Sequence, residues 1–240
     1  MTSPMAKPFV LSPPAAPVER HGSVDLHLPA GDGPFPAVVV LHGAPLPPGT
    51  PDCRDMPVFR GYGALLAEQG VVAGVVNYRV EDIAQLPATA DGIAAMVEQV
   101  RADPRVDGDR VALWFFSGGG LFTGDWLRDP PPWLRAIALT YPLLVPFPEW
   151  GVEDKRFLPV EALGGTGRVP VVLTRAGQDM PLVLASIEAF LTAAERVDWP
   201  VQVLEVPDGG HSFDLLLPTE ESRQAIRTAR DAVVALLRAD

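Results

Sequence analysis

The chain has 240 residues, enough for one large domain or two small ones, and 48% of them are hydrophobic while 20% are charged. This balance is typical of a globular protein with a substantial core. The formal net charge of -11 argues against binding to nucleic acid, because phosphates are bound by clustered basic side chains. The single cysteine, Cys53, excludes an intramolecular disulfide and a cysteine-rich metal site.

Residues 1–20 form a proline-rich leader, which has five prolines and no continuous apolar run. A signal peptide needs an apolar centre, and a membrane-spanning helix needs about 20 apolar residues, so the leader fits neither. We therefore expect a soluble, cytoplasmic protein that does not bind membranes, with residues 21–240 as its one domain. The leader could cover this domain, extend freely or bridge to another subunit, which leaves a homodimer open.

Apolar segments of strand length alternate with segments of helical periodicity along the rest of the chain. Residues 23–29 alternate in polarity, as edge strands do, and residues 36–43 are a continuous run typical of a strand buried on both faces. Further strands are expected at 71–78, 110–117, 135–141, 169–177 and 201–207. Helices are expected at 58–70, 89–102, 182–197 and 219–238, the last with Thr219 as its N-cap. This alternation predicts an α/β fold with a mostly parallel sheet covered by helices on both faces.

Polar residues that directly follow the strands are the candidates for function, because ligands of such sheets gather at the carboxyl ends of strands. Ser117 ends one buried strand and precedes three glycines, Gly118–Gly120, which can open a helix. So tight a turn needs residues without side chains, and it would aim the Gly118 amide at a group bonded to Ser117. The alternative is a glycine-rich turn with an incidental serine, although neither GxGxxG nor GxxxxGK[ST] occurs here.

A serine hydroxyl becomes a nucleophile only when a base removes its proton. His211, one of four histidines, lies in a glycine-rich loop after the last predicted strand, and Asp179 follows the strand before it. Each residue alone is a weak signal. The order Ser117, Asp179, His211, each after its own strand, is that of the α/β-hydrolase triad and predicts acyl transfer.

The loop after residues 36–43 could complete such a site. Its Ala44 amide could bind an oxyanion together with that of Gly118, whereas Pro45 has no amide to donate. His42 is expected to brace this loop or to border the substrate pocket. No carboxylate lies near His42 in the sequence, so a zinc site is not expected there.

The segment 124–160, rich in proline and tryptophan, is expected to form a short cap-like insertion. Its Phe147 and Trp150 are candidates for the wall of a pocket that takes a small-molecule substrate of largely apolar character.

The segments LHGAP, VNYR, PRVDGDRVALWFFSGGG, GQD and GGHSFD resemble characteristic segments of the α/β-hydrolase superfamily, most closely its dienelactone-hydrolase-like and small acyl-esterase branch. The resemblance extends from about Val24 to Arg238 and implies a sheet of about eight strands. It further implies hydrolysis of esters or related acyl compounds without a metal or organic cofactor. Ser117 takes the place of the nucleophile, Asp179 of the acid and His211 of the base. Dienelactone hydrolases themselves have a cysteine nucleophile, so Ser117 argues against that activity.

Phe115 departs from this family, which usually has glycine or another small residue two positions before the nucleophile, where the next helix packs. We expect the glycines after Ser117 to let the turn adapt, so that the serine keeps its place. Two alternatives stay open. The fold could serve acyl transfer, lyase or cyclisation chemistry, or Phe115 could displace Ser117 and leave a protein that only binds ligands.

Overall fold

An eight-stranded sheet, ordered β1-β2-β4-β3-β5-β6-β7-β8, runs through the computed structural model, which describes residues 7–46, 49–165 and 167–239. β1 and β2 are antiparallel to their neighbours, and every pairing from β4 to β8 is parallel. The predicted α/β class and mostly parallel sheet are therefore confirmed. The strands are β1 (Val18–His21), β2 (Val24–His27), β3 (Phe35–Leu41), β4 (Val72–Val76), β5 (Val106–Phe116), β6 (Leu134–Thr140), β7 (Val171–Gln178) and β8 (Val201–Gly210).

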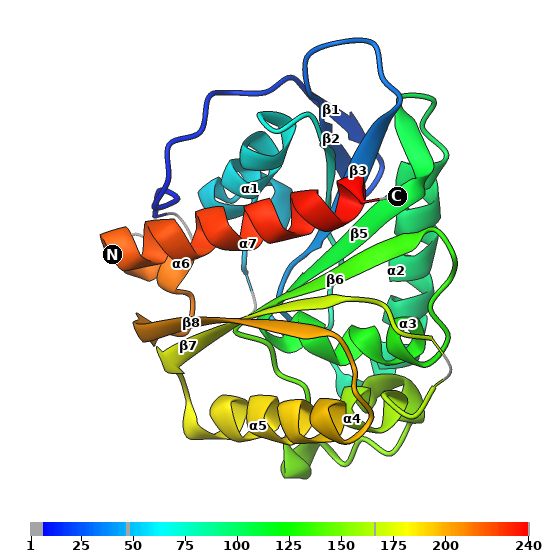
Figure 1. Cartoon of the computed structure of the whole chain (residues 1–240), viewed down its shortest axis with the longest axis vertical. Coiled ribbons are helices and arrows are strands. Elements are labelled where there is room, and N and C mark those ends of the chain that lie inside the picture. The colour runs from blue at the N-terminus through cyan, green and yellow to red at the C-terminus, as the bar shows by residue number, and fades with distance from the viewer. Residues whose placement is uncertain (1–6, 47–48, 166, 240) are drawn as a thin grey trace.

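Helices cover both faces of the sheet (Figure 1). On one face pack α1 (Pro57–Ala67), the short α6 (Phe213–Leu216) and α7 (Glu220–Arg238). On the other pack α2 (Leu86–Arg101), the short α3 (Gly124–Arg128), α4 (Pro159–Ala162) and α5 (Pro181–Arg196). None of the helices within the described ranges has the length and apolar character needed to cross a membrane.

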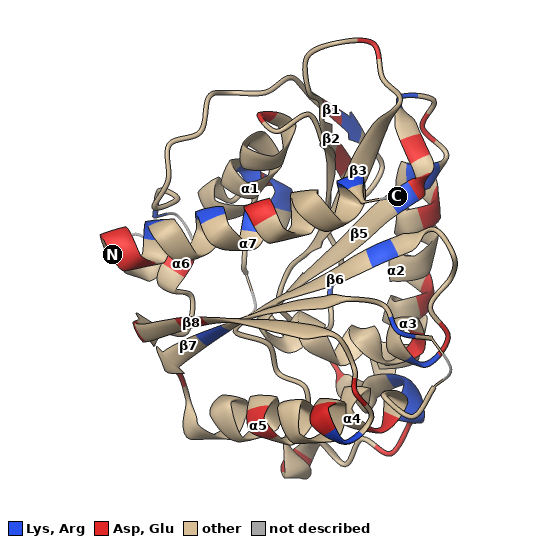
Figure 2. Ribbon diagram, in the orientation of Figure 1, with Lys and Arg blue, Asp and Glu red and all other residues tan. Residues whose placement is uncertain are grey.

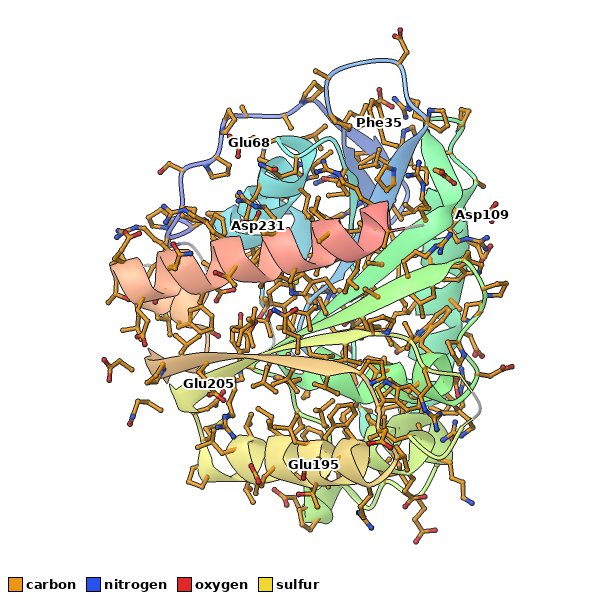
Figure 3. All side chains as sticks on the ribbon, viewed as in Figure 1. Phe35, Glu68, Asp109, Glu195, Glu205 and Asp231 are labelled. Carbon is orange, nitrogen blue, oxygen red and sulfur yellow. The ribbon has the colours of Figure 1, made fainter. Side chains whose placement is uncertain are left out.

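The central strands divide their side chains between two cores. In β5, Leu113 and Phe115 pack beneath the α2 and α5 layer, whereas Trp114 and Phe116 pack beneath the α1 and α7 layer. Figure 3 shows side chains filling the space between the sheet and both layers, while Glu195 on α5 and Asp231 on α7 are exposed. A strand buried on both faces has no polar side, which explains the continuous apolar runs in the sequence.

The ends of α7 follow ordinary helix chemistry. The Thr219 hydroxyl accepts a hydrogen bond from the Ser222 N–H at 3.1 Å, which confirms the predicted N-cap. Glu220 and Glu221 stand in the first turn, visible in red at the start of α7 in Figure 2, where the helix dipole favours negative charge. Elsewhere in Figure 2, the positions of acidic and basic residues are interspersed along the ribbon of both helical layers.

Part of the predicted leader is built into the molecule. Phe9 and Val10 are only 8% and 9% exposed, and the Phe9 ring lies 4.9 Å from the ring of Tyr62 on α1. The Val10 N–H donates to the Asp214 carbonyl on α6 at 3.2 Å, and its carbonyl accepts from Arg223 Nε on α7 at 3.0 Å. Residues 7–12, the N-terminal segment, thus join three helices on one face.

Three of the four residues of strand β1, residues 18–20, also fall inside the predicted leader. This strand pairs with β2 at the edge of the sheet, where all four of its side chains are exposed. Because none of them enters the core, no apolar pattern in the sequence indicates this strand.

His27 on β2 is a buried histidine whose ring nitrogens have no hydrogen-bond partner among the described residues. A Cβ on Gly63 of α1 would stand only 2.5 Å from the imidazole, so the ring packs directly on that helix. Burial lowers the pKa of His27 from 6.5 to about 4, because the charged form would lose its hydration.

We expect His27 to make stability fall in acid. Above pH 6.5 the ring is neutral in both states; between pH 6.5 and 4 the unfolded chain takes up a proton that the folded chain resists. The free energy of unfolding should therefore drop by about 3 kcal/mol across this range. His27→Leu should remove that part of the drop in urea unfolding from pH 7 to pH 4. The control His21→Leu changes a ring that is 52% exposed, and it should leave the drop unchanged. If unfolding of His27→Leu depended on acid as much as that of wild type, the assignment would be contradicted.

Candidate functional site

Ser117 stands where β5 turns sharply into a 3-10 helix, η4 (Ser117–Thr123). Its φ of +51° lies in the left-handed region that residues with a side chain rarely adopt. Such a strained serine between a buried strand and a helix is the geometry of a nucleophile elbow, which presents the hydroxyl at the carboxyl edge of the sheet.

Three side chains from three strand ends meet at this edge. Ser117 Oγ lies 2.7 Å from His211 Nε2, and His211 Nδ1 lies 2.9 and 3.0 Å from the two carboxylate oxygens of Asp179. The Asp179 side chain has no exposed surface, whereas that of His211 is 25% exposed. The Met180 N–H also donates to Asp179, at 2.7 Å. A carboxylate accepting from Nδ1–H leaves Nε2 free to take the serine proton, so the arrangement can activate Ser117.

The backbone proposed to hold an oxyanion lies against the serine. A Cβ on Gly43 would stand 3.0 Å from Ser117 Cβ, and a Cβ on Gly118 would overlap the Ala44 carbonyl oxygen. The Ala44 N–H donates no hydrogen bond within the described part of the chain. Gly118 is in the first turn of η4, where N–H groups have no acceptor inside the helix. Both amides therefore belong to segments that touch beside Ser117.

His42 braces this loop, which is one of its two predicted roles. Its Nδ1 bonds the Gly43 carbonyl at 2.7 Å, Nε2 accepts from the Tyr78 N–H at 3.2 Å, and the Tyr78 hydroxyl donates to the His42 carbonyl. The two rings stack at 4.0 Å. Burial lowers the pKa of His42 to about 4, so the ring stays neutral. His42 is not among the residues that line the cavity at Ser117; its ring nitrogens bond the Gly43 carbonyl and the Tyr78 N–H instead.

A cavity of about 160 Å³ opens beside Ser117 and His211. Its walls are largely apolar, and they come from the loop after β3, from the start of α1 and from α6. The larger apolar lining residues are Leu46, Met56, Val58, Phe59, Phe116 and Leu215. Sequence reasoning missed all of them, although Met56–Phe59 follow the Ala44 loop and Leu215 follows His211 closely in the chain.

Phe147 and Trp150, predicted as a pocket wall, do not line this cavity. Their rings lie 4.7 Å apart, and both pack against the core beneath α2 and α5. The cavity lies with the α1 and α7 core, on the other side of the sheet. The prediction failed because aromatic composition does not reveal which face of a sheet a loop will cover. The range 124–160 also contains strand β6, as the prediction of a strand at 135–141 implies.

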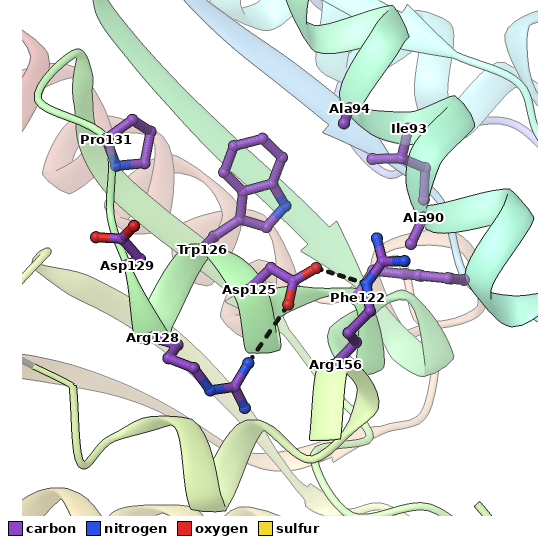
Figure 4. Close-up of a pocket in the computed structure, with 10 residues that line it drawn as sticks. All are labelled: Ala90, Ile93, Ala94, Phe122, Asp125, Trp126, Arg128, Asp129, Pro131 and Arg156. Carbon is purple, nitrogen blue, oxygen red and sulfur yellow. Dashed lines mark hydrogen bonds and ion pairs between the residues drawn. The ribbon is translucent and has the colours of Figure 1, made fainter. Parts of the chain in front are cut away.

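A larger cavity, about 430 Å³, lies between α2 and α3 (Figure 4). Ser117, His211 and Asp179 are not among its lining residues. Three of its four charged side chains pair with one another: Asp125 binds Arg156 at 2.7 Å and Arg128 at 3.4 Å. Without a nucleophile beside a base, this cavity does not compete with the one at Ser117 for acyl chemistry.

Phe115 leaves Ser117 in place. Its side chain has no exposed surface and packs in the α2 and α5 core. The three glycines provide the clearance: a Cβ on Gly119 would stand 2.5 Å from the His42 carbonyl oxygen, and one on Gly120 2.6 Å from that of Leu143. The chain after the serine thus passes between two loops as a 3-10 helix, a longer run of this kind than is usual, instead of packing as a regular helix.

The described residues offer neither an activated thiol nor a cluster of metal ligands. Cys53 is fully buried, and burial raises the pKa of its thiol to about 12. Among the described residues, no three His, Cys, Asp or Glu side chains gather as metal ligands would.

No protein-family profile matches the chain, and no curated protein sequence matches it. Solved structures do match. Thermogutta terrifontis esterase 2 phosphoramylated by tabun superimposes with a TM-score of 0.72 over 94% of this chain and 96% of that one, at 20% identity. A mutant of esterase rPPE gives a TM-score of 0.74 over 94% and 84%, at 18% identity. The propionate-bound form of the Thermogutta esterase gives 0.64 over 92% and 94%, at 19% identity. At such identities the likeness shows a shared fold.

Proposed function

We propose that this chain, which has the α/β-hydrolase fold, is a serine hydrolase that cleaves carboxylic ester bonds in small, largely apolar molecules. One observation carries the proposal: the hydrogen bonds from Ser117 Oγ to His211 and from His211 to Asp179. A shared fold alone would not support it, because one fold hosts many functions. The modification of a structural neighbour by tabun and paraoxon adds support, since both are reagents for activated serines.

The proposed reaction has two acyl-transfer steps. Ser117 Oγ attacks the ester carbonyl carbon while its proton passes to His211 Nε2, and Asp179 stabilises the imidazolium that forms. The carbonyl electron pair moves to oxygen, for which the Ala44 and Gly118 N–H groups are the proposed donors. The carbon–oxygen bond to the alcohol then breaks, and His211 returns its proton to the leaving group. Water, deprotonated by the same ring, attacks the acyl carbon; the bond to Ser117 Oγ then breaks, His211 returns the proton to Oγ, and the carboxylic acid is released.

The size of the cavity predicts a short acyl group. Its volume of about 160 Å³ is close to that of an engineered cavity that holds benzene, so about six carbons fill it. We expect kcat/KM for 4-nitrophenyl butanoate to exceed that for the octanoate at least about tenfold, because the longer chain cannot be buried. Leu215→Ala should narrow this ratio by extending the cavity. Leu217→Ala, outside the lining, should not, and a wild type that prefers octanoate would contradict the assignment.

Incubation with a fluorophosphonate, followed by intact mass and peptide mapping, tests the function directly. We expect one adduct, on Ser117, that is lost in Ser117→Ala and strongly reduced in His211→Ala. Ser212→Ala is the matched control, because Ser212 lines the same cavity and should leave labelling intact. An unlabelled wild type beside a labelled control esterase would refute the proposal and favour ligand binding. A labelled chain that releases no acid from esters would point to acyl transfer or another reaction of the fold.

A further inference from the structure

We infer that Asp214 is a positioning residue for His211: its carboxylate, held by two tyrosine hydroxyls, fixes the Tyr141 ring against the imidazole and adds a second negative charge beside it. This inference deepens the proposed function, and the part that concerns the reaction rate rests on it. The effect of Asp214 on the His211 imidazole can be measured without turnover.

Asp214 has no exposed surface and is bound by side chains from two distant parts of the chain. The Tyr62 hydroxyl, from α1, donates to Oδ2 at 3.0 Å. The Tyr141 hydroxyl, from the residue after β6, lies 2.8 and 2.9 Å from the two carboxylate oxygens. Burial raises the pKa of both tyrosines well above 10, so both hydroxyls keep their protons and act as donors. The carboxylate therefore ties α1 and the end of β6 to α6.

Tyr141 transmits this restraint to the imidazole. Its ring centroid lies 4.8 Å from that of His211 at an angle of 55°, and both residues line the cavity. Its φ of +38° is in the left-handed region, a strained backbone that surrounding structure must enforce. With its hydroxyl bound, the phenol cannot swing away, so one side of the His211 ring has a fixed wall. Asp179 fixes Nδ1, and the two restraints together aim Nε2 at Ser117.

The charge of Asp214 acts on the same ring. Burial raises the pKa of Asp214 to about 6, while the two hydroxyls and His211 work to lower it. The interaction of two charges is reciprocal. If the imidazolium of His211 stabilises the ionised form of Asp214, the ionised Asp214 stabilises that imidazolium by the same free energy. The titratable groups facing Asp214 are Tyr62, Tyr141 and His211, with Asp179 beyond the imidazole and Arg223 of α7 bound to the Val10 carbonyl.

Asp214→Asn tests the inference, because it keeps the shape and removes the charge. Two quantities are measured against pH: the rate of Ser117 phosphonylation, and the proton NMR shift of the His211 ring, assigned by its absence in His211→Ala. We expect the acid limb of labelling and the ring titration to move to lower pH, since the imidazolium loses a stabilising charge. Labelling on the plateau should slow about tenfold, because the ring is held less well.

Asp25→Asn is the matched control. Asp25 is also a buried carboxyl, but it pairs with Arg20 near the edge of the sheet, away from the imidazole. The substitution Asp25→Asn should destabilise the chain and leave both pH midpoints as in wild type. Tyr141→Phe keeps the ring and removes the hydroxyl, and it should shift the midpoints in the same direction as Asp214→Asn. If Asp214→Asn fails to fold, the pH midpoints of Tyr141→Phe test the inference in its place.

The outcomes separate this inference from the proposed function. Wild type labelled on Ser117, with midpoints unchanged in Asp214→Asn and Tyr141→Phe, overturns the positioning role and leaves the hydrolase proposal intact. Wild type unlabelled, with the His211 titration still shifted by Asp214→Asn, overturns the hydrolase proposal and supports the link between Asp214 and the imidazole.

Discussion

Ser117→Ala is expected to lower kcat for 4-nitrophenyl butanoate by about 10⁶-fold, the loss measured when the serine of an established triad is removed. The reason is geometric: the His211 Nε2 that lies 2.7 Å from Ser117 Oγ would have no proton to accept, and no acyl-enzyme could form. KM should change little, because the apolar walls of the cavity stay in place. Steady-state kinetics of the purified variant measure both constants, and thermal unfolding checks that the fold is intact.

Two comparisons make this result specific. Ser212→Ala should keep kcat within about threefold of wild type, since Ser212 lines the cavity but the hydrogen bond to His211 Nε2 comes from Ser117. Activity above a tenth of wild type in Ser117→Ala would exclude Ser117 as the nucleophile, and His211 would then have to activate water or another group.

Gly118→Ala is expected to lower kcat by about 10²- to 10³-fold, the range measured for loss of one oxyanion donor. The added Cβ would overlap the Ala44 carbonyl oxygen, a backbone atom that cannot rotate away as a side chain can. The Ala44 loop must therefore move outward, and both proposed amide donors lose their alignment. Stopped-flow or steady-state kinetics with 4-nitrophenyl butanoate, beside urea unfolding, separate lost rate from lost stability.

Gly92→Ala is the control for this substitution. Gly92 lies inside α2 with no atom within 4 Å of an added Cβ. Alanine there should leave kcat unchanged and stabilise the helix by up to about 1 kcal/mol. If Gly118→Ala retained full rate, the close packing of Ala44 on Gly118 would have no part in catalysis, and other donors would have to hold the oxyanion.

The sequence was most informative where one strand end carried one polar residue. Ser117, Asp179 and His211 could be placed together because parallel strands end at a common edge, which turns their order along the chain into proximity. The cavity walls could not be placed in this way. Phe147 and Trp150 have the composition of a pocket, but the face that a loop covers depends on packing far away in the chain.

Phe115 illustrates a second limit. A bulky residue before the serine suggests a damaged turn when that position is considered alone. The compensation lies in the contacts of Gly119 and Gly120 with the carbonyls of His42 and Leu143, and only coordinates reveal such close approaches. In the sequence, the run of three glycines indicated that the turn after Ser117 could adapt. It did not indicate in which direction the chain would continue.

The contacts of the N-terminal segment set an order for assembly during synthesis. Val10 leaves the ribosome well before its partners Asp214 and Arg223 are made; Arg223 follows Val10 by 213 residues. These contacts of Val10 must therefore wait until α6 and α7 have been made. The helix α6, which carries part of the cavity wall, lies in the same late segment. A nascent chain would thus complete its sheet before its binding cavity, and only a chain made as far as α6 would hold a substrate.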